Sequence, residues 1–164
     1  MPVQQIAVER FSVVSSKPFP EVLAAIDAAI GHPNLGEMQR DVAASNSYAE
    51  MEAVIGKVVG PTDLMEFLRL DMAMYIAKGK PGPVPRSVRL LVGNPLIMRR
   101  MAEHVPDTAS YAPVTILIDE RADGVHLSYD RMASFLASYG NAEASAVAAE
   151  LDRKVEAMLT EAAR

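Results

Sequence analysis

The stretch "RLLVGNPLIMRRMAEHVPD", residues 89–107, decides the fold because it changes secondary structure within three residues. Its leucines and valine are typical of a buried strand, which we place at 87–92. Gly93-Asn94-Pro95 then breaks the strand, since Asn caps helices well and Pro suits the first helical position. An amphipathic run follows, so the stretch predicts a helix at 95–105. A helix start also attracts anions, with Arg86, Arg89, Arg99 or Arg100 nearby, and this second interpretation stays open.

Working outward, hydrophobic periodicity and turn residues predict five strands and five helices. The expected strands lie at 6–14, 64–71, 87–92, 114–120 and 125–130, the last two joined by a turn at 121–124. The segment 64–71 could also be a helix, but its length and the preceding Gly60-Pro61 favour a strand. The expected helices lie within 18–32, from Ser47 to Gly60, at 72–80, at 95–105 and at 141–164. Residues 32–46 carry Pro, Gly and Asn and are predicted to be a loop.

Two helix starts carry specific signals. Ser47 and Glu50 form the S-x-x-E pattern of a capping box. Asn141 is the expected N-cap of the last helix, whose apolar stripe recurs at helical spacing. That stripe consists of Val147, Leu151, Val155, Met158 and Ala162.

Strands interspersed with helices predict an α+β fold with helices on one face of a sheet. The chain has 164 residues, which fits a single domain, 1–164. Its ten methionines fill core gaps or line a pocket.

Composition excludes several classes of function. The net charge is −5 without a basic cluster, so we expect no nucleic-acid partner. Charges interrupt every apolar run, so we expect no membrane partner. The absence of Cys excludes thiol nucleophiles and disulfides, and it suits the cytoplasm, where we expect the protein to be located.

Residues 92–130 resemble the core of a bacterial domain-of-unknown-function family, number 302 (DUF302). The resemblance rests on Gly93-Asn94-Pro95, Pro106-Asp107, Pro113, Asp119-Glu120 and Gly124. Residues 63–80 resemble the family's second strand and following helix. The likeness extends from the first strand to Gly140 and covers about two thirds of the chain. Residues 32–61 look like a family-variable insertion.

The resemblance implies a TBP-like α+β fold with a curved, mainly antiparallel five-stranded sheet and helices packed on one face, to which the sequence adds the long C-terminal helix. It also implies a homodimer. It implies no activity, because a fold alone does not determine function.

Glu66 and Asp71 are candidate site residues on the expected strand 64–71. Strict alternation places Glu66 on one face with leucines, and Arg69 and Asp71 on the other. A carboxylate among leucines is costly unless it is paired or faces a cavity. Glu66 is therefore either a general acid or base with a raised pKa or a carboxylate bonded to an Arg.

Four further residues complete the candidate site: Asn94, His104, Tyr111 and Tyr129. His104 is predicted to lie on the apolar stripe of the helix 95–105, where it is either a hydrogen-bonded rim residue or functional. The strand-helix-strand connection could bring His104, Tyr111 and Tyr129 around one cleft. The alternative is that the tyrosine rings pack in the structure while their hydroxyl groups face water.

Other site types find no support in the sequence. His32, His104 and His126 lack metal-ligand spacing, so we predict no metal site. No nucleophile elbow or dinucleotide fingerprint occurs, and no cofactor is indicated.

The leading hypothesis is a non-enzymatic homodimeric domain that binds a small anionic or apolar molecule between the sheet and its helices. Glu66, Asp71, Asn94, His104, Tyr111 and Tyr129 would line the site. One alternative is an enzyme with Glu66 or His104 as general acid or base. Another is an interaction module without a ligand.

Overall fold

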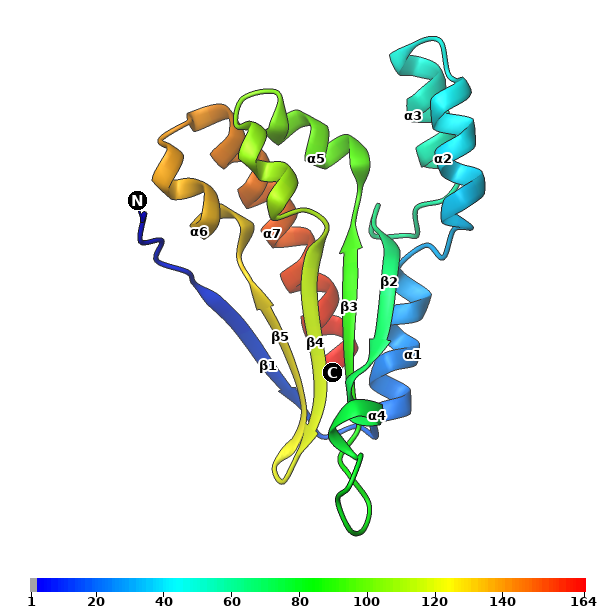
Figure 1. Ribbon diagram of the computed structural model, residues 1–164, viewed down its shortest axis with the longest axis vertical. Helices are drawn as coiled ribbons and strands as arrows, with labels where there is room; N and C mark the ends of the chain where they lie inside the picture. Colours follow the sequence, from blue (N-terminus) through cyan, green and yellow to red (C-terminus); the bar gives the residue numbers. More distant parts are fainter. Residues whose placement is uncertain (1–2) are drawn as a thin grey trace.

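Five antiparallel strands form one curved sheet in the computed structural model, which describes residues 3–164 (Figure 1). Their spatial order is β1 (Arg10–Ser15), β5 (Gly124–Asp130), β4 (Val114–Arg121), β3 (Ser87–Gly93) and β2 (Met65–Asp71). All five strands lie where the alternation of apolar residues predicts them. β1 starts at Arg10 rather than at residue 6, because its pairing with β5 begins there.

Helices cover one face of this sheet. The α-helices are α1 (Phe19–Ala29), α2 (Leu35–Ala44), α3 (Tyr48–Gly56), α4 (Met72–Ile76), α5 (Pro95–Ala102), α6 (Met132–Leu136) and α7 (Ala142–Ala163). Two 3₁₀ turns, η1 (Pro106–Ser110) and η2 (Ala137–Tyr139), complete the structure. α7 packs against α1, α5, α6 and strands β1 and β5, so it is the centre of the helical layer (Figure 1).

The main core lies between the sheet and α7. Leu90, Val92, Ile116 and Ile118 project from the central strands and have no exposed surface. The predicted stripe of α7 is buried along its whole length, and Asn141 caps the helix by accepting a hydrogen bond from the Ala144 amide. The sequence pattern therefore identified the α+β sandwich correctly.

The opposite face of the sheet remains open. Arg89 and Thr115 project from it and are exposed, whereas Leu91 and Leu117 are half-buried. This face carries the alternate residues of the same strands, as the two-residue period of a strand requires.

The predicted loop at 32–46 is wrong, because most of it forms α2. Asn34 caps this helix by accepting a hydrogen bond from the Glu37 amide at 3.1 Å. Met38, buried on α2, packs with Ile55 of α3 and Met65 of β2 in a second, smaller core. In this segment Pro, Gly and Asn mark the start of a helix instead of a loop. Packing against α3 stabilises this short helix.

The helices α3 and α5 begin where predicted but end earlier, α3 at Gly56 instead of Gly60. Ser47 caps α3 as predicted, accepting from the Glu50 amide at 3.2 Å. α5 ends at Ala102, three residues earlier than expected, and the chain then turns into η1. Within residues 3–164, no helix combines the length and the apolar character needed to span a bilayer.

Candidate functional site

A β-bulge in β2 changes which side chains share a face. Glu66 pairs with Val92, but Leu68 pairs with Leu91, so Phe67 is an extra residue on this strand. The predicted alternation is therefore wrong beyond Phe67. Glu66 and Arg69 lie on the same helix-covered face, whereas a regular strand would separate them.

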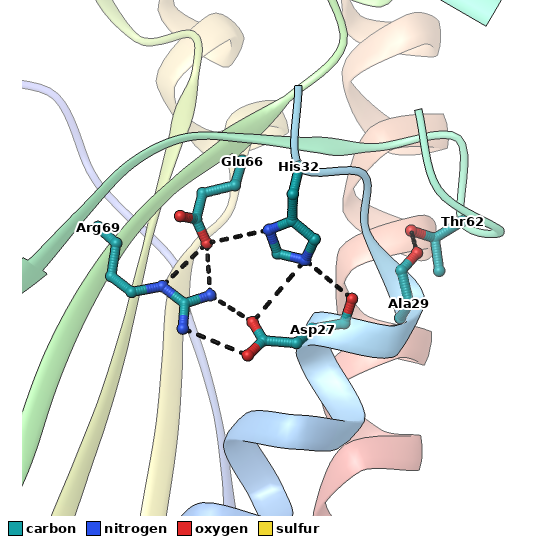
Figure 2. A network of polar contacts seen from close by, with 6 residues as sticks. All are labelled: Asp27, Ala29, His32, Thr62, Glu66 and Arg69. Carbon is teal, nitrogen blue, oxygen red and sulfur yellow. Dashed lines mark hydrogen bonds and ion pairs between the residues drawn. The ribbon is translucent and has the colours of Figure 1, made fainter. Parts of the chain in front are cut away.

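The bulge builds a polar network between β2 and α1 (Figure 2). The Arg69 guanidinium donates to Glu66 Oε2 from Nε at 3.0 Å and from Nη2 at 2.6 Å. It also donates to both carboxylate oxygens of Asp27 on α1. Two interpretations of Glu66 were predicted, and the structure agrees with the carboxylate that is bonded to an Arg.

His32 lies between the two carboxylates of this network (Figure 2). Its Nε2 is 3.0 Å from the main-chain oxygen of Asp27, which accepts a hydrogen bond from this nitrogen. Its Nδ1 lies 3.8 Å from Glu66 Oε2. A charged imidazolium would therefore add a second cation between Asp27 and Glu66.

Asp27, His32 and Glu66 are also the residues that could hold a metal ion. One ligand atom from each lies within 4.8 Å of the others. Arg69 already donates to both carboxylates, and hydrogen bonds to Asp27 raise the pKa of its guanidinium further. A metal ion would have to compete with this full positive charge, so the geometry suits a clamp between α1 and β2 better than a metal centre.

Three other predicted site residues have local structural partners. Asn94 caps α5 through the Leu96 amide at 2.8 Å and donates to the main-chain oxygen of Asp63 at 2.9 Å. Asp71 caps α4 by accepting from the Met74 amide. His104 is exposed beyond the end of α5, so the prediction that it lies on an apolar stripe is wrong.

The Tyr129 side chain is part of the core, although the residue also lines a pocket with Arg89 and Asp130 on the open face of the sheet. Its ring is 1% exposed, and its hydroxyl donates to the buried carboxylate of Asp152 at 2.6 Å. Burial and the negative charge of Asp152 raise the pKa of the Tyr129 hydroxyl. The expected ring of His104, Tyr111 and Tyr129 around one cleft is therefore not formed.

Tyr111 does line a cavity, on the open face of the sheet. We call this cavity the sheet-face groove; its volume is about 490 Å³. Its lining includes Arg89, Leu91, Tyr111, Pro113, Thr115 and Phe135. The Tyr111 ring stacks on Phe135 with centroids 4.9 Å apart, and its hydroxyl lies 3.0 Å from that of Tyr139.

Arg89 supplies an uncompensated positive charge to this groove. Its only side-chain hydrogen bond within residues 3–164 goes to Thr115 Oγ1, at 3.3 Å, and none of the ion pairs found there includes it. Asp130 also lines the groove but is held by Arg10 through two hydrogen bonds of 2.6 and 2.9 Å. These bonds hold the pKa of the Asp130 carboxyl below its usual value.

The sequence matches the family "Domain of unknown function DUF302" over residues 40–162, three quarters of the chain. The chain belongs to the DUF302 family. The sequence resemblance is thereby confirmed. No curated protein matches the sequence.

A crystal structure of an uncharacterized conserved DUF302 protein from Bacillus stearothermophilus has a similar fold. The TM-score is 0.64 at 10% sequence identity, over 94% of this chain and 98% of that chain. At such low identity the likeness concerns the fold alone, and it agrees with the α+β sheet and helices described above.

Sequence reasoning missed Asp27 and His32 as site residues in this DUF302 chain, whereas Arg89 was one of four arginines considered for an anion at the start of α5. Asp27 and His32 are more than thirty residues from Glu66, and only the bulge and the packing of α1 bring the three together. Arg89 did carry a signal, because it is a lone cation in an otherwise apolar strand segment. Such a residue either faces solvent or binds an anion, and alternation alone does not separate the two.

Proposed function

We propose that this DUF302 protein binds a small organic anion in the sheet-face groove and performs no chemistry on it. The observation that carries the proposal is the Arg89 guanidinium, which lines a concave site without a carboxylate partner. A carboxylate is the natural counterion, because its two oxygens match the paired N–H groups of Arg.

The groove supplies further contacts suited to such a ligand. Thr115 Oγ1 beside Arg89 can donate to the same anion. Leu91, Pro113 and the Tyr111–Phe135 pair offer apolar walls for the remainder of the molecule. This combination of apolar walls and a few convergent polar groups is typical of small-molecule sites.

Electrostatics favour an anion at this place in an acidic protein. Arg10 already neutralises Asp130, so the positive charge of Arg89 is the unbalanced one on this part of the sheet. Of the six residues predicted from the sequence, Tyr111 belongs to the proposed ligand wall. Glu66 does not line the groove, which weighs against its use as a general base there.

The proposal is tested by titrating ¹⁵N-labelled protein with hexanoate and with benzoate, followed by NMR. We expect shifts at Arg89, Thr115 and Tyr111, and affinity about tenfold to a hundredfold weaker in Arg89→Gln, since hydrogen bonds to charged groups contribute about 1.5–3 kcal/mol. Arg100→Gln removes the same charge from the exposed side of α5 and should bind like the wild type.

Two outcomes would overturn the proposal: no carboxylate binds the wild type, or Arg89→Gln binds as well as Arg100→Gln. Native mass spectrometry of the purified protein adds an independent measurement. It would detect a retained anion, and it would also determine whether the binding unit is the homodimer that the family resemblance implies.

A further inference from the structure

We infer that the anion bound at Arg89 carries an unbranched apolar chain, and that this chain enters a second recess at the end of the groove. This inference rests on the proposed function. The recess has a volume of about 100 Å³ and is lined by Phe67, Gly93, Met98, Met101, Pro113 and Leu151, among others. We call it the apolar recess.

The apolar recess offers almost nothing to a polar group. Asn94 is the one side-chain amide in its lining, and its oxygen and nitrogen are already bonded to the Leu96 amide and to Asp63. Polar groups of a ligand would lose their bonds to water here without replacement. The occupant is therefore a hydrocarbon.

The recess and the sheet-face groove are neighbours. Ala112, Pro113 and Val114 line both of them. Along β3, Arg89 and Leu91 line the groove and Gly93 lines the recess, and these alternate residues point to the same face of the strand. At about 3.3 Å per residue in a twisted strand, Gly93 lies roughly 13 Å from Arg89. A ligand anchored at Arg89 can therefore reach the recess along a path past Leu91.

Gly93 and the bulge explain why the recess exists. A Cβ atom at Gly93 would lie 3.3 Å from Pro113 Cβ and 3.6 Å from Phe67 Cε2, so a side chain there would crowd the space between them. Phe67, the extra residue of the bulge, forms the opposite wall. Glycine thus keeps open a recess that any other residue would narrow.

The dimensions select the class of ligand. A recess of about 100 Å³ accepts the end of an alkyl chain, whereas the wider groove accepts rings. Met98 and Met101 are flexible and can close around such a chain. The span of roughly 13 Å corresponds to a medium-length monocarboxylate such as octanoate or decanoate.

The experiment compares the affinities of butyrate, hexanoate, octanoate, decanoate and dodecanoate for the full-length protein. We expect the affinity to rise about threefold to fourfold for each methylene that is buried, and to level off once the recess is full. Affinity that does not change with chain length, while binding still requires Arg89, would overturn this inference and leave the proposed function intact. If no carboxylate binds, the proposed function fails as well.

Met98→Trp tests the location of the chain, because the larger side chain should fill the recess. We expect it to abolish the gain with chain length, whereas Met98→Leu, of similar volume, should retain the gain. A gain that persists in a folded Met98→Trp protein would overturn the inference.

A measurement on the wild type does not depend on the folding of any variant. Nuclear Overhauser contacts should connect the terminal methyl group of octanoate with the methyl groups of Met98 or Met101. Contacts of that methyl group with the rings of Tyr111 and Phe135 alone would place the chain in the groove and overturn the inference.

Discussion

Asp152 is a carboxylate without exposed surface whose hydrogen bonds join three elements. It accepts from the Tyr129 hydroxyl at 2.6 Å and from the Met132 and Ala133 amides at 2.7 and 3.1 Å. It thereby ties α7 to the end of β5 and caps the start of α6. A buried charge is tolerated only with such compensation, so this group holds the structure together and does not face a ligand.

Because of Tyr129, the free energy of unfolding of the protein should fall as the pH rises above 10. The folded state raises the pKa of its hydroxyl through burial and the charge of Asp152. Unfolded Tyr loses its proton near pH 10, so above pH 10 the unfolded state binds fewer protons than the native state, and the free energy of unfolding falls by up to about 1.4 kcal/mol per pH unit.

Urea unfolding of the wild type and Tyr129→Phe at pH 9 and pH 11 measures this effect. At pH 9 the variant should be less stable by about 1–2 kcal/mol, because it lacks the bond to Asp152. At pH 11 the difference should shrink by about 1.4 kcal/mol, since only the wild type loses this proton on unfolding. A difference that is the same at both pH values would show that Tyr129 does not titrate in this way.

At the scale of elements, the sequence predicted what depends on local periodicity and missed what depends on distant contacts. The strands and the caps at Ser47 and Asn141 follow from residues within one turn or one strand. α2 was missed because its stability depends on the second core as well as on the cap at Asn34. The bulge at Phe67 is an exception to alternation that the sequence pattern does not contain.

The same limit applies to the candidate site. Glu66 was identified because a carboxylate is conspicuous between leucines, and its Arg partner was one of the two interpretations. Arg69 was assigned to the wrong face, since a regular strand separates residues three apart. The groove could not be predicted, because Arg89 and Tyr111 meet only after η1 returns the chain to β4.

One close chain crossing holds the connection between α1 and β2, and it requires glycine on both crossing segments. A Cβ atom at Gly31 would lie only 1.8 Å from the Val58 main-chain oxygen, and one at Gly60 would lie 2.3 Å from the Ile30 carbonyl carbon. Gly31 also accepts a hydrogen bond from the Glu66 amide at 2.8 Å, so this crossing positions the start of β2.

Gly31→Ala should therefore destabilise the protein by about 3 kcal/mol, because main-chain atoms must move to make room. Gly56→Ala is the matched control: it lies at the end of α3, and a Cβ atom there meets nothing within 4 Å. The control should be neutral or more stable by up to about 1 kcal/mol, since Ala favours helix. Thermal unfolding of the two variants measures both effects, and equal stability would contradict the crossing argument.

At the scale of the whole molecule, the two cores divide the protein into unequal parts. The main core joins the sheet to α1, α5, α6 and α7, whereas the second core holds the α2–α3 hairpin against Met65, Phe67 and Leu96. A small core supplies less burial than a large one, so the hairpin should open without unfolding the sheet. The groove and the proposed anion site lie on the sheet and should survive this opening.

Hydrogen exchange under native conditions separates the two parts. We expect α2 and α3 amides to exchange with lower opening free energies than those of β3, β4 and β5. Ile55→Ala removes a side chain of the second core and should lower protection by about 3 kcal/mol in α2 and α3 alone. Ile116→Ala removes an equally buried side chain of the main core and should lower protection throughout. If Ile55→Ala accelerates exchange in the sheet as much as in the hairpin, the molecule opens as one unit, and the hairpin is an integral part of the scaffold that carries the groove.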